Sequence, residues 1–285
     1  MGTDLQVTRW SLISVEAQPV CQHIFIFRSV AVASHRRAGV GADLSAALVS
    51  FVLKEPAGVA VAMAGFRIRR YRDEDDEAVK EIFTMGMIEH VPACFVHLLK
   101  QPLVQMALMC TFCALLTSSK SLLLPVLTVT LMLAGLRQMA SYMFRSYIEA
   151  CLKEDLACIR ETYMGKGDSC FWVAESEGQV LATVACQPSP TQPECLELKR
   201  MSVRRTHRGL GMGKALCQAL ADHTRERGYL AVVLGTSIIQ TDAQKLYEHL
   251  GYTKIREFTY PSLMAKLSNF SIIEYRLELQ ERKIE

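Results

Sequence analysis

Three glycines stand at every second position in the segment Arg208-Gly209-Leu210-Gly211-Met212-Gly213-Lys214. Before it, apolar residues at Leu196, Leu198 and, less regularly, Met201 and Val203 predict a strand over 195–203. After it, apolar residues at helical spacing predict a helix that ends near residue 228. Glycine permits positive φ, so backbone amides can converge at the helix start, where the helix dipole also favours negative charge. The segment therefore predicts a strand, loop and helix that bind an anion, and we expect a pyrophosphate.

The order of residues separates this loop from two other phosphate-binding loops. A Rossmann loop needs G-x-G-x-x-G and a Walker loop needs G-K-[ST], whereas Lys214 is followed by Ala215. The order R-x-x-G-x-G from Arg208 to Gly213 resembles instead the acyl-CoA loop of the GCN5-related N-acetyltransferases. For the loop taken alone, a turn without a ligand is the alternative interpretation.

A second block, in the expected order, supports the resemblance. Residues 230–234 predict a short buried strand, and residues 243–250 predict a helix that ends at Gly251. The block resembles the A-x-x-L-Y-x-x-x-G-[FY] signature of the same family and places Tyr247 at its tyrosine. The family usually has asparagine three residues before the alanine, where this chain has Gln240. Because glutamine also donates and accepts hydrogen bonds, we expect a modified contact with CoA there.

Four further segments extend the resemblance to the camello-like acetyltransferases, the N-acetyltransferase 8 family. These segments are 66–71, 89–93, 170–175 and 196–208. The resemblance implies an α/β (α+β) fold, with a twisted, mostly antiparallel sheet flanked by helices on both faces. It also implies acetyl-CoA as cosubstrate and an endoplasmic reticulum membrane. The acceptors it implies are the α-amine of cysteine S-conjugates or the lysines of proteins, with action on protein or histone lysine only as the alternative.

Residues 63–285 are expected to form the N-acetyltransferase domain. Residues 1–62 show no sustained periodicity and no motif. We expect them to be an extended or mispredicted translation product, with a disordered leader as the alternative. The apolar stretch 20–34 is too short, and too interrupted by Arg28, to predict a membrane span.

The segment 102–136 contains a single ionisable residue, Lys120, and is typical of a membrane segment. As one helix it would reach roughly 50 Å, against a hydrocarbon layer of ~30 Å. A division at residues 118–121 gives two arms of roughly 24 to 27 Å, each slightly short for a full span. Two buried helices of a soluble protein are the alternative interpretation.

The implied fold decides the topology, because its first strand and helix, about residues 66–87, must pack with everything after residue 169. Both ends of the apolar segment must then lie on one side of the bilayer. We therefore predict a helical hairpin or re-entrant loop with Lys120 near its tip and Pro125 absorbed as a kink. The flanking residues Lys100, Arg137 and Arg145 favour the cytosol for both ends. A lumenal active site is the alternative that the family offers.

The net charge and the cysteine content limit the classes of partner and cofactor that we expect. A net charge of +3 is too small to indicate a nucleic-acid partner. Basic residues near the loop are assigned to CoA phosphates, with a solvated surface as the alternative for Arg204 and Arg205. This basic set is Lys199, Arg200, Arg204, Arg205 and Arg208. Ten cysteines without framework spacing indicate reduced thiols, and the C-x-x-C at 110–113 has no partner pair, so we expect no metal.

Acetyl transfer needs a polarised thioester carbonyl, a proton for the departing thiolate and an amine without its proton. By the resemblance, the backbone N–H of Met201, or alternatively Ser202, polarises the carbonyl. The resemblance also implies that Tyr247 protonates the thiolate, with an ordinary buried tyrosine as the alternative. The expected cofactor-binding set is Met201, Val203, Arg208, Gly209, Leu210, Gly211, Met212, Gly213, Lys214, Gln240 and Tyr247.

Glu197 is the candidate base, acting through water, and a solvated strand residue is the equal alternative. A lysine amine with a pKa of ~10.4 is neutral only about one part in a thousand near pH 7, whereas an α-amine near ~7.8 needs hardly any base. Arg145 and His90 could pair a substrate carboxylate, although structural roles are preferred. No cysteine stands beside a recognisable base, which favours direct transfer in a ternary complex. The rival function is a membrane-anchored protein that binds acyl-CoA without turnover, which Gln240 and the uncertain base leave open.

Overall fold

The computed structural model describes residues 65–119, 121–165, 167–259 and 263–279. The predictions for residues 1–62 and for Lys120 at a hairpin tip lie outside the described residues. The described chain forms one seven-stranded sheet in the order β1-β2-β3-β4-β5-β7-β6. The strands are β1 Arg67–Arg70, β2 Cys170–Ser176, β3 Gln179–Pro188, β4 Cys195–Val203, β5 Ala231–Ser237, β6 Thr253–Thr259 and β7 Ser271–Glu278. The β4–β5 pair is parallel and the other pairs are antiparallel, which agrees with the mostly antiparallel sheet that the resemblance implies.

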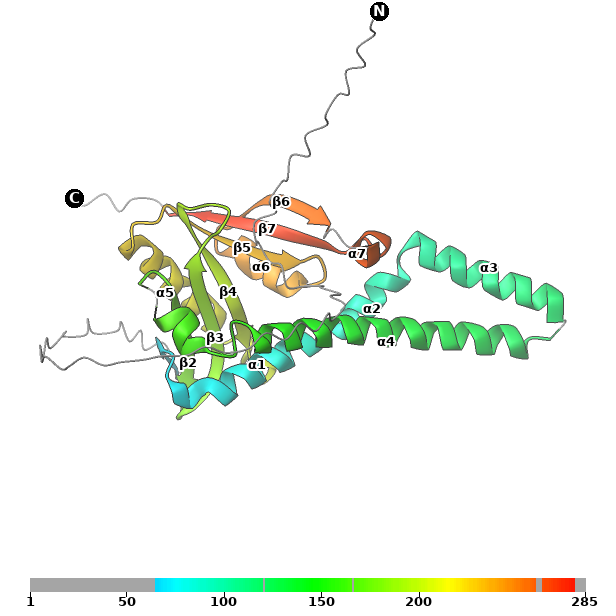
Figure 1. Cartoon of the computed structure of the whole chain (residues 1–285), viewed down its shortest axis with the longest axis horizontal. Helices are drawn as coiled ribbons and strands as arrows, with labels where there is room; N and C mark the ends of the chain where they lie inside the picture. The colour runs from blue at the N-terminus through cyan, green and yellow to red at the C-terminus, as the bar shows by residue number, and fades with distance from the viewer. Residues whose placement is uncertain (1–64, 120, 166, 260–262, 280–285) are drawn as a thin grey trace, which may run out of the picture.

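Helices cover both faces of the sheet, which confirms the expected α+β architecture (Figure 1). The helices are α1 Asp76–Ile88, α2 Val91–Leu99, α3 Pro102–Ser119, α4 Leu123–Lys153, α5 Met212–Glu226, α6 Thr241–His249 and α7 Leu263–Ser268. Three short turns, η1 Asp73–Asp75, η2 Arg160–Met164 and η3 Arg205–His207, complete the element order.

Successive side chains of a strand point to opposite faces of the sheet, so the hydrophobic core is divided between the two faces. On β2, Trp172 and Ala174 belong to the cluster that contains Leu216 and Leu220 of α5. The intervening Phe171 and Val173 belong to the cluster built on α1 and the C-terminal part of α4. Each strand of the centre is therefore buried on both sides, and the helices are fixed to opposite faces.

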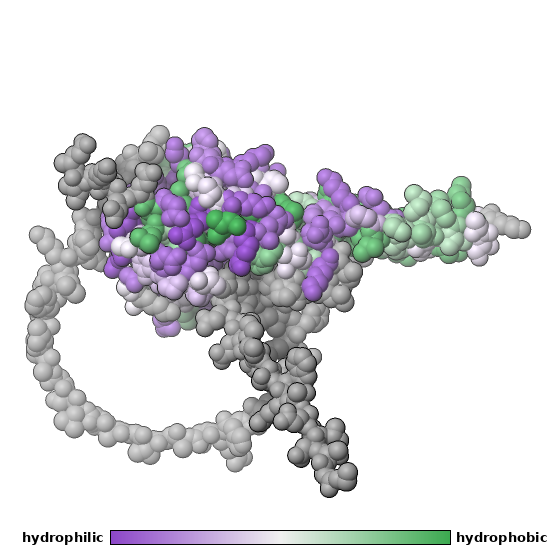
Figure 2. Space-filling model, turned by 90° about the horizontal axis from the view of Figure 1, so that it is seen from above, coloured by the Kyte–Doolittle hydropathy of each residue, from purple (hydrophilic) through white to green (hydrophobic). Residues whose placement is uncertain are grey.

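The helices α3 and α4 form a hairpin that projects from the domain (Figure 1). No residue of α3 is buried, and Leu103, Met106 and Met109 are each more than half exposed. The far end of the projection carries a hydrophobic surface (Figure 2). Pro125 lies in the first turn of α4, where a missing N–H breaks no intrahelical hydrogen bond, so the predicted kink is not needed.

The segments before and after the hairpin belong to the same sheet. Strand β1 pairs with β2, and Arg69 of β1 forms ion pairs with Asp75 and with Glu175 of β2. The pairing joins residues about a hundred positions apart in sequence. Both ends of the hairpin therefore return to one side, the topological condition on which the sequence prediction depends.

By length and composition, three helical segments in the described chain could cross a membrane: Asp73–Leu99, Pro102–Ser119 and Leu123–Lys153. The first includes α1, whose Val79, Ile82 and Phe83 are buried in the core of the domain. Because α1 belongs to that core, we assign membrane-compatible apolar surface to α3 and the N-terminal part of α4 only.

Candidate active site

The parallel strands β4 and β5 are paired over only a short distance. Their register runs from Cys195 with Ala231 to Glu197 with Val233, and it ends there. Beyond Glu197, β4 stays paired with β3, while β5 stays paired with β7. The two strands therefore separate and open a wedge in the middle of the sheet.

A bulge in β4 lies beside this wedge. Between the pairs Thr183–Ser202 and Ala185–Lys199, the single residue Val184 of β3 opposes two residues of β4, which are 200 and 201. Arg200 has φ +52, in the left-handed region, which costs a non-glycine residue about 1–3 kcal/mol. Its carbonyl accepts a hydrogen bond of 2.8 Å from Thr183 Oγ1. Met201, the predicted carbonyl-polarising residue, is thus the second residue of the bulge.

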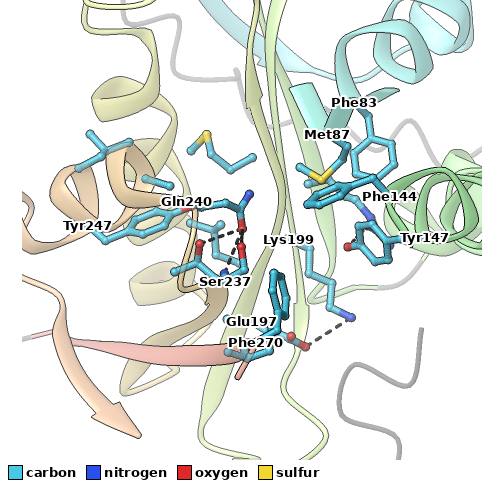
Figure 3. A pocket seen from close by; sticks show the side chains of 18 of the residues that line it. Phe83, Met87, Phe144, Tyr147, Glu197, Lys199, Ser237, Gln240, Tyr247 and Phe270 are labelled. Atoms are coloured by element: carbon cyan, nitrogen blue, oxygen red, sulfur yellow. Dashed lines mark hydrogen bonds and ion pairs between the residues drawn. The ribbon is translucent and has the colours of Figure 1, made fainter. Parts of the chain in front are cut away.

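A cavity of about 220 Å³ fills the wedge (Figure 3). Its floor is β4 and β5, one wall is α6, and the other wall is α1 and α4. Apolar side chains dominate that second wall and the end near β7, and they are Phe83, Met87, Met143, Phe144, Phe270 and Ile272. The cavity therefore suits a compound with a substantial apolar group.

Tyr247 of α6 lies on the wall opposite Phe83 and Phe144 (Figure 3). Its side chain is buried, with a relative exposure of 5%. Burial, with a smaller contribution from Cys217, raises the pKa of the Tyr247 phenol well above its ordinary value. The phenol is therefore protonated throughout the neutral range, which is the form that a proton donor requires.

Glu197 and Lys199 bring two opposite charges into this apolar cavity (Figure 3). Glu197 Oε2 lies 3.4 Å from Lys199 Nζ, and the side chains are only 8% and 24% exposed. The structure thus places the candidate base in the cavity and excludes a solvated strand residue. The sequence analysis assigned Lys199 to the CoA phosphates and did not predict that it lines this cavity. The cavity forms only when β4 packs against helices that are distant in sequence.

Arg200 is not available for a phosphate, so its assignment to CoA is wrong. The guanidinium is largely buried and forms two hydrogen bonds with Asp155, at 2.7 Å and 2.6 Å. Arg204 instead pairs with Glu81 of α1, at 2.7 Å, while remaining partly exposed. Of the basic set, these two residues connect β4 and its following turn to the helices on one face.

The glycine loop has the predicted conformation. Gly209 and Gly211 have φ +80 and +83, and Gly211 is the N-cap of α5. Gly213 serves a different purpose, because a Cβ there would lie 3.2 Å from Leu246 Cδ2 of α6. The loop therefore presents the first amides of a 15-residue helix, while its last glycine allows α5 and α6 to approach closely.

Arg208, at the start of the loop, is held from two sides. Its Nη2 lies 2.7 Å from Glu89 Oε2, and its Nε donates to the Val203 carbonyl at 3.2 Å. The guanidinium is 44% exposed. The loop is thereby connected to the junction of α1 and α2, and Arg208 still reaches solvent at the helix N-terminus.

Gln240, the residue at the family's asparagine position, caps α6 and lines the cavity. Its Oε1 accepts hydrogen bonds from Thr236 Oγ1, from the Ser237 amide and from Ser237 Oγ, at 3.1, 3.0 and 2.9 Å. Its Nε2 lies 3.3 Å from His90 Nε2. The glutamine oxygen thus stabilises the turn from β5 to α6, so any contact with CoA falls to the amide nitrogen.

His90 and Arg145, the two candidates for binding a substrate carboxylate, lie in different surroundings. Burial, and secondarily the charge of Arg208, lower the pKa of His90, which favours the neutral imidazole. Arg145 is exposed and is absent from the cavity lining. Of the cationic residues that line the cavity, Arg200 is paired with Asp155 and Lys199 with Glu197. Among the described residues, no group of three or more His, Cys, Asp and Glu side chains could hold a metal ion.

Comparison with known proteins places this chain in a family. The model of the acetyltransferase (GNAT) family matches residues 136–252, from within α4 to the end of the second motif. N-acetyltransferase family 8 member 3 of Mus musculus is 35% identical over 224 residues, which cover 78% of this chain and 99% of that protein. N-acetyltransferase 8 of the same species is 37% identical, over 75% of this chain and 95% of that protein. The Xenopus tropicalis relative named camello is 35% identical, over 76% and 100%.

These relatives span residues on both sides of the projecting hairpin and almost their own full length. The chain therefore belongs to the camello-like N-acetyltransferase 8 family, within the GCN5-related acetyltransferases, and is an acetyl-CoA-dependent N-acetyltransferase.

Proposed function

We propose that this enzyme is anchored in the endoplasmic reticulum membrane and acetylates the α-amine of cysteine S-conjugates. The observation that carries the acceptor class is the Glu197–Lys199 pair inside a mostly apolar cavity. An amino acid with a large apolar side chain has the complementary pattern, since its ammonium and carboxylate match the two charges. Protein lysine is the second acceptor class, and it offers no carboxylate beside its amine.

Each chemical requirement has a residue in the proposed mechanism. The amides of residues 209–213 bind the pyrophosphate of acetyl-CoA at the start of α5. The Met201 amide, in the β4 bulge, donates to the carbonyl oxygen as negative charge develops there. Glu197 accepts the amine proton, directly or through water, and Tyr247 donates a proton to the departing thiolate sulfur. The amine attacks the acetyl carbon while both substrates are bound, so no acetylated protein residue forms.

The test of this function uses microsomes that contain the chain, acetyl-CoA and S-benzylcysteine. CoA release that depends on the amine is expected, and the product is the Nα-acetyl compound. A peptide with one lysine and a blocked N-terminus tests the second acceptor class in the same assay. Tight acetyl-CoA binding without release for every amine would instead support the rival, a membrane-anchored acyl-CoA-binding protein.

Lys199→Met is expected to raise KM for S-benzylcysteine by at least about tenfold, because the substrate carboxylate loses its counter-ion in a mostly apolar cavity. S-benzylcysteamine, which has the same amine and apolar group but no carboxylate, is the matched substrate. Its KM should change by less than about twofold. Steady-state kinetics with both amines measure the difference, and an equal change in both KM values would contradict carboxylate binding by Lys199.

The hairpin is proposed to insert into the bilayer with the acetyltransferase domain on the cytosolic side. Its exposed apolar surface and the return of both its ends to one sheet support insertion as a hairpin. The flanking Lys100, Arg137 and Arg145 support the cytosolic side. Glycosylation acceptor sites placed before Gly65 and after Leu279 are therefore expected to remain unmodified in microsomes. A control acceptor fused behind a cleaved secretory signal should be modified. Modification at one of the two ends only would rule out the hairpin, and modification at both would put the domain in the lumen.

A further inference from the structure

Arg200 joins three separate parts of the molecule through one side chain. Besides its two hydrogen bonds with Asp155, its Nη1 donates to Tyr147 Oη at 3.2 Å and to Cys151 Sγ at 3.1 Å. The guanidinium carbon also lies 5.1 Å from the centre of the Phe83 ring. These partners come from α1, from the last turns of α4 and from the segment after α4. Arg200 is therefore fixed by elements that are distant from β4 in the sequence.

The backbone of the same residue forms the β4 bulge. Its left-handed conformation sets the direction of the next peptide group, which carries the Met201 N–H. Burial alone would raise the pKa of Asp155, but the hydrogen bonds and charge of Arg200 outweigh it and lower that pKa. The ion pair is thus intact in the neutral range, and its fork geometry resists rotation of either partner.

We infer that the Arg200–Asp155 pair is a positioning device that holds the β4 bulge against α4 and so aims the Met201 amide at the thioester carbonyl. This inference rests on the proposed role of Met201. Neither Arg200 nor Asp155 has to touch the reacting atoms. A small displacement of the amide is enough to lower the rate, because the donor must meet the developing oxyanion and not the ground-state carbonyl. Acetyl-CoA affinity depends on the separate loop at residues 208–214 and is not affected.

The experiment compares Arg200→Lys, Asp155→Asn and the double variant Arg200→Met with Asp155→Leu in purified full-length protein. Either single variant should lower kcat at least about tenfold and leave the Kd for acetyl-CoA within about twofold. Asp155→Asn leaves the buried Arg200 guanidinium without a carboxylate, and Arg200→Lys cannot form both hydrogen bonds with Asp155 in the same geometry. The melting temperatures of both single variants should therefore fall. The double variant removes both charges and should recover the stability that an unpaired buried charge costs, although Tyr163 Oη loses its hydrogen bond to Asp155.

The double variant separates positioning from stability. If the pair positions the bulge, kcat stays low in the double variant although its melting temperature recovers. Recovery of kcat together with stability would show a merely structural pair and would overturn the inference. The matched control is Arg160→Gln, which breaks an exposed Arg160–Asp73 pair of 2.7 Å near the same segment and should leave kcat unchanged. Wild-type protein without turnover would overturn the proposed function itself, whereas active wild type with equally active variants overturns only this inference.

Discussion

Gly211→Val is expected to weaken acetyl-CoA binding by at least about a hundredfold, equivalent to about 3 kcal/mol. Gly211 has φ +83, and a β-branched residue avoids that conformation, so the loop must change its path. A new path turns the loop amides away from the pyrophosphate. Open space surrounds the position, and a Cβ added there would meet no atom within 4 Å, so the effect comes from the backbone and not from a clash.

Gly178→Val is the matched control, because Gly178 has φ +76 and equally open surroundings. It lies in the turn between β2 and β3, away from the cavity. Both variants should lose similar stability, but the control should keep its Kd for acetyl-CoA within about twofold. Isothermal titration with acetyl-CoA and a thermal melt of each protein measure the two quantities. Equal affinities in the two variants would remove the loop from the binding site.

Tyr247→Phe is expected to lower kcat by about a hundredfold while Kd for acetyl-CoA is unchanged, since it removes the proposed proton donor and little packing volume. The raised pKa means that wild-type Tyr247 keeps its proton to strongly alkaline pH. A loss of activity between pH 7 and pH 9 should therefore not come from this residue. Pre-steady-state CoA release compares the two proteins.

Tyr252→Phe provides the control within the same cluster. Its ring centroid lies 5.5 Å from that of Tyr247, and it is also buried, but it is absent from the cavity lining. The Tyr252 hydroxyl finds no hydrogen-bond partner among the described residues, so its removal should leave stability unchanged or slightly raised. A comparable drop in kcat for both variants would indicate a packing effect and not proton transfer.

Local features of the site were predictable from the sequence. Strand β4 has the predicted limits, Gly209 and Gly211 have the predicted positive φ, and the helix after the loop ends just before Gly228. Each of these follows from residues that are neighbours in the chain. The existence of a hairpin was predictable for the same reason, because an apolar run of this length has few alternatives.

The sequence was a poorer guide to which face of the sheet each β4 side chain occupies, and the bulge explains why. Leu196 and Leu198 face the α5 cluster, but after the extra residue the contact passes to Met201 and Val203. The irregular apolar spacing in the sequence is the trace of this bulge. Arg200 then faces the C-terminal end of α4. Its partner Asp155 follows that helix and is 45 positions away, so only the folded chain brings the two together.

The length of α4 has a practical consequence for anyone who wants a water-soluble version of this enzyme. The helix is continuous over 31 residues, about 46 Å, and the same rod supplies Met143, Phe144 and Tyr147 to the cavity. Deleting the whole of α4 together with α3 would therefore remove one wall of the cavity. A linker that replaces residues 103–136 alone would retain that wall and remove the exposed apolar part of the hairpin.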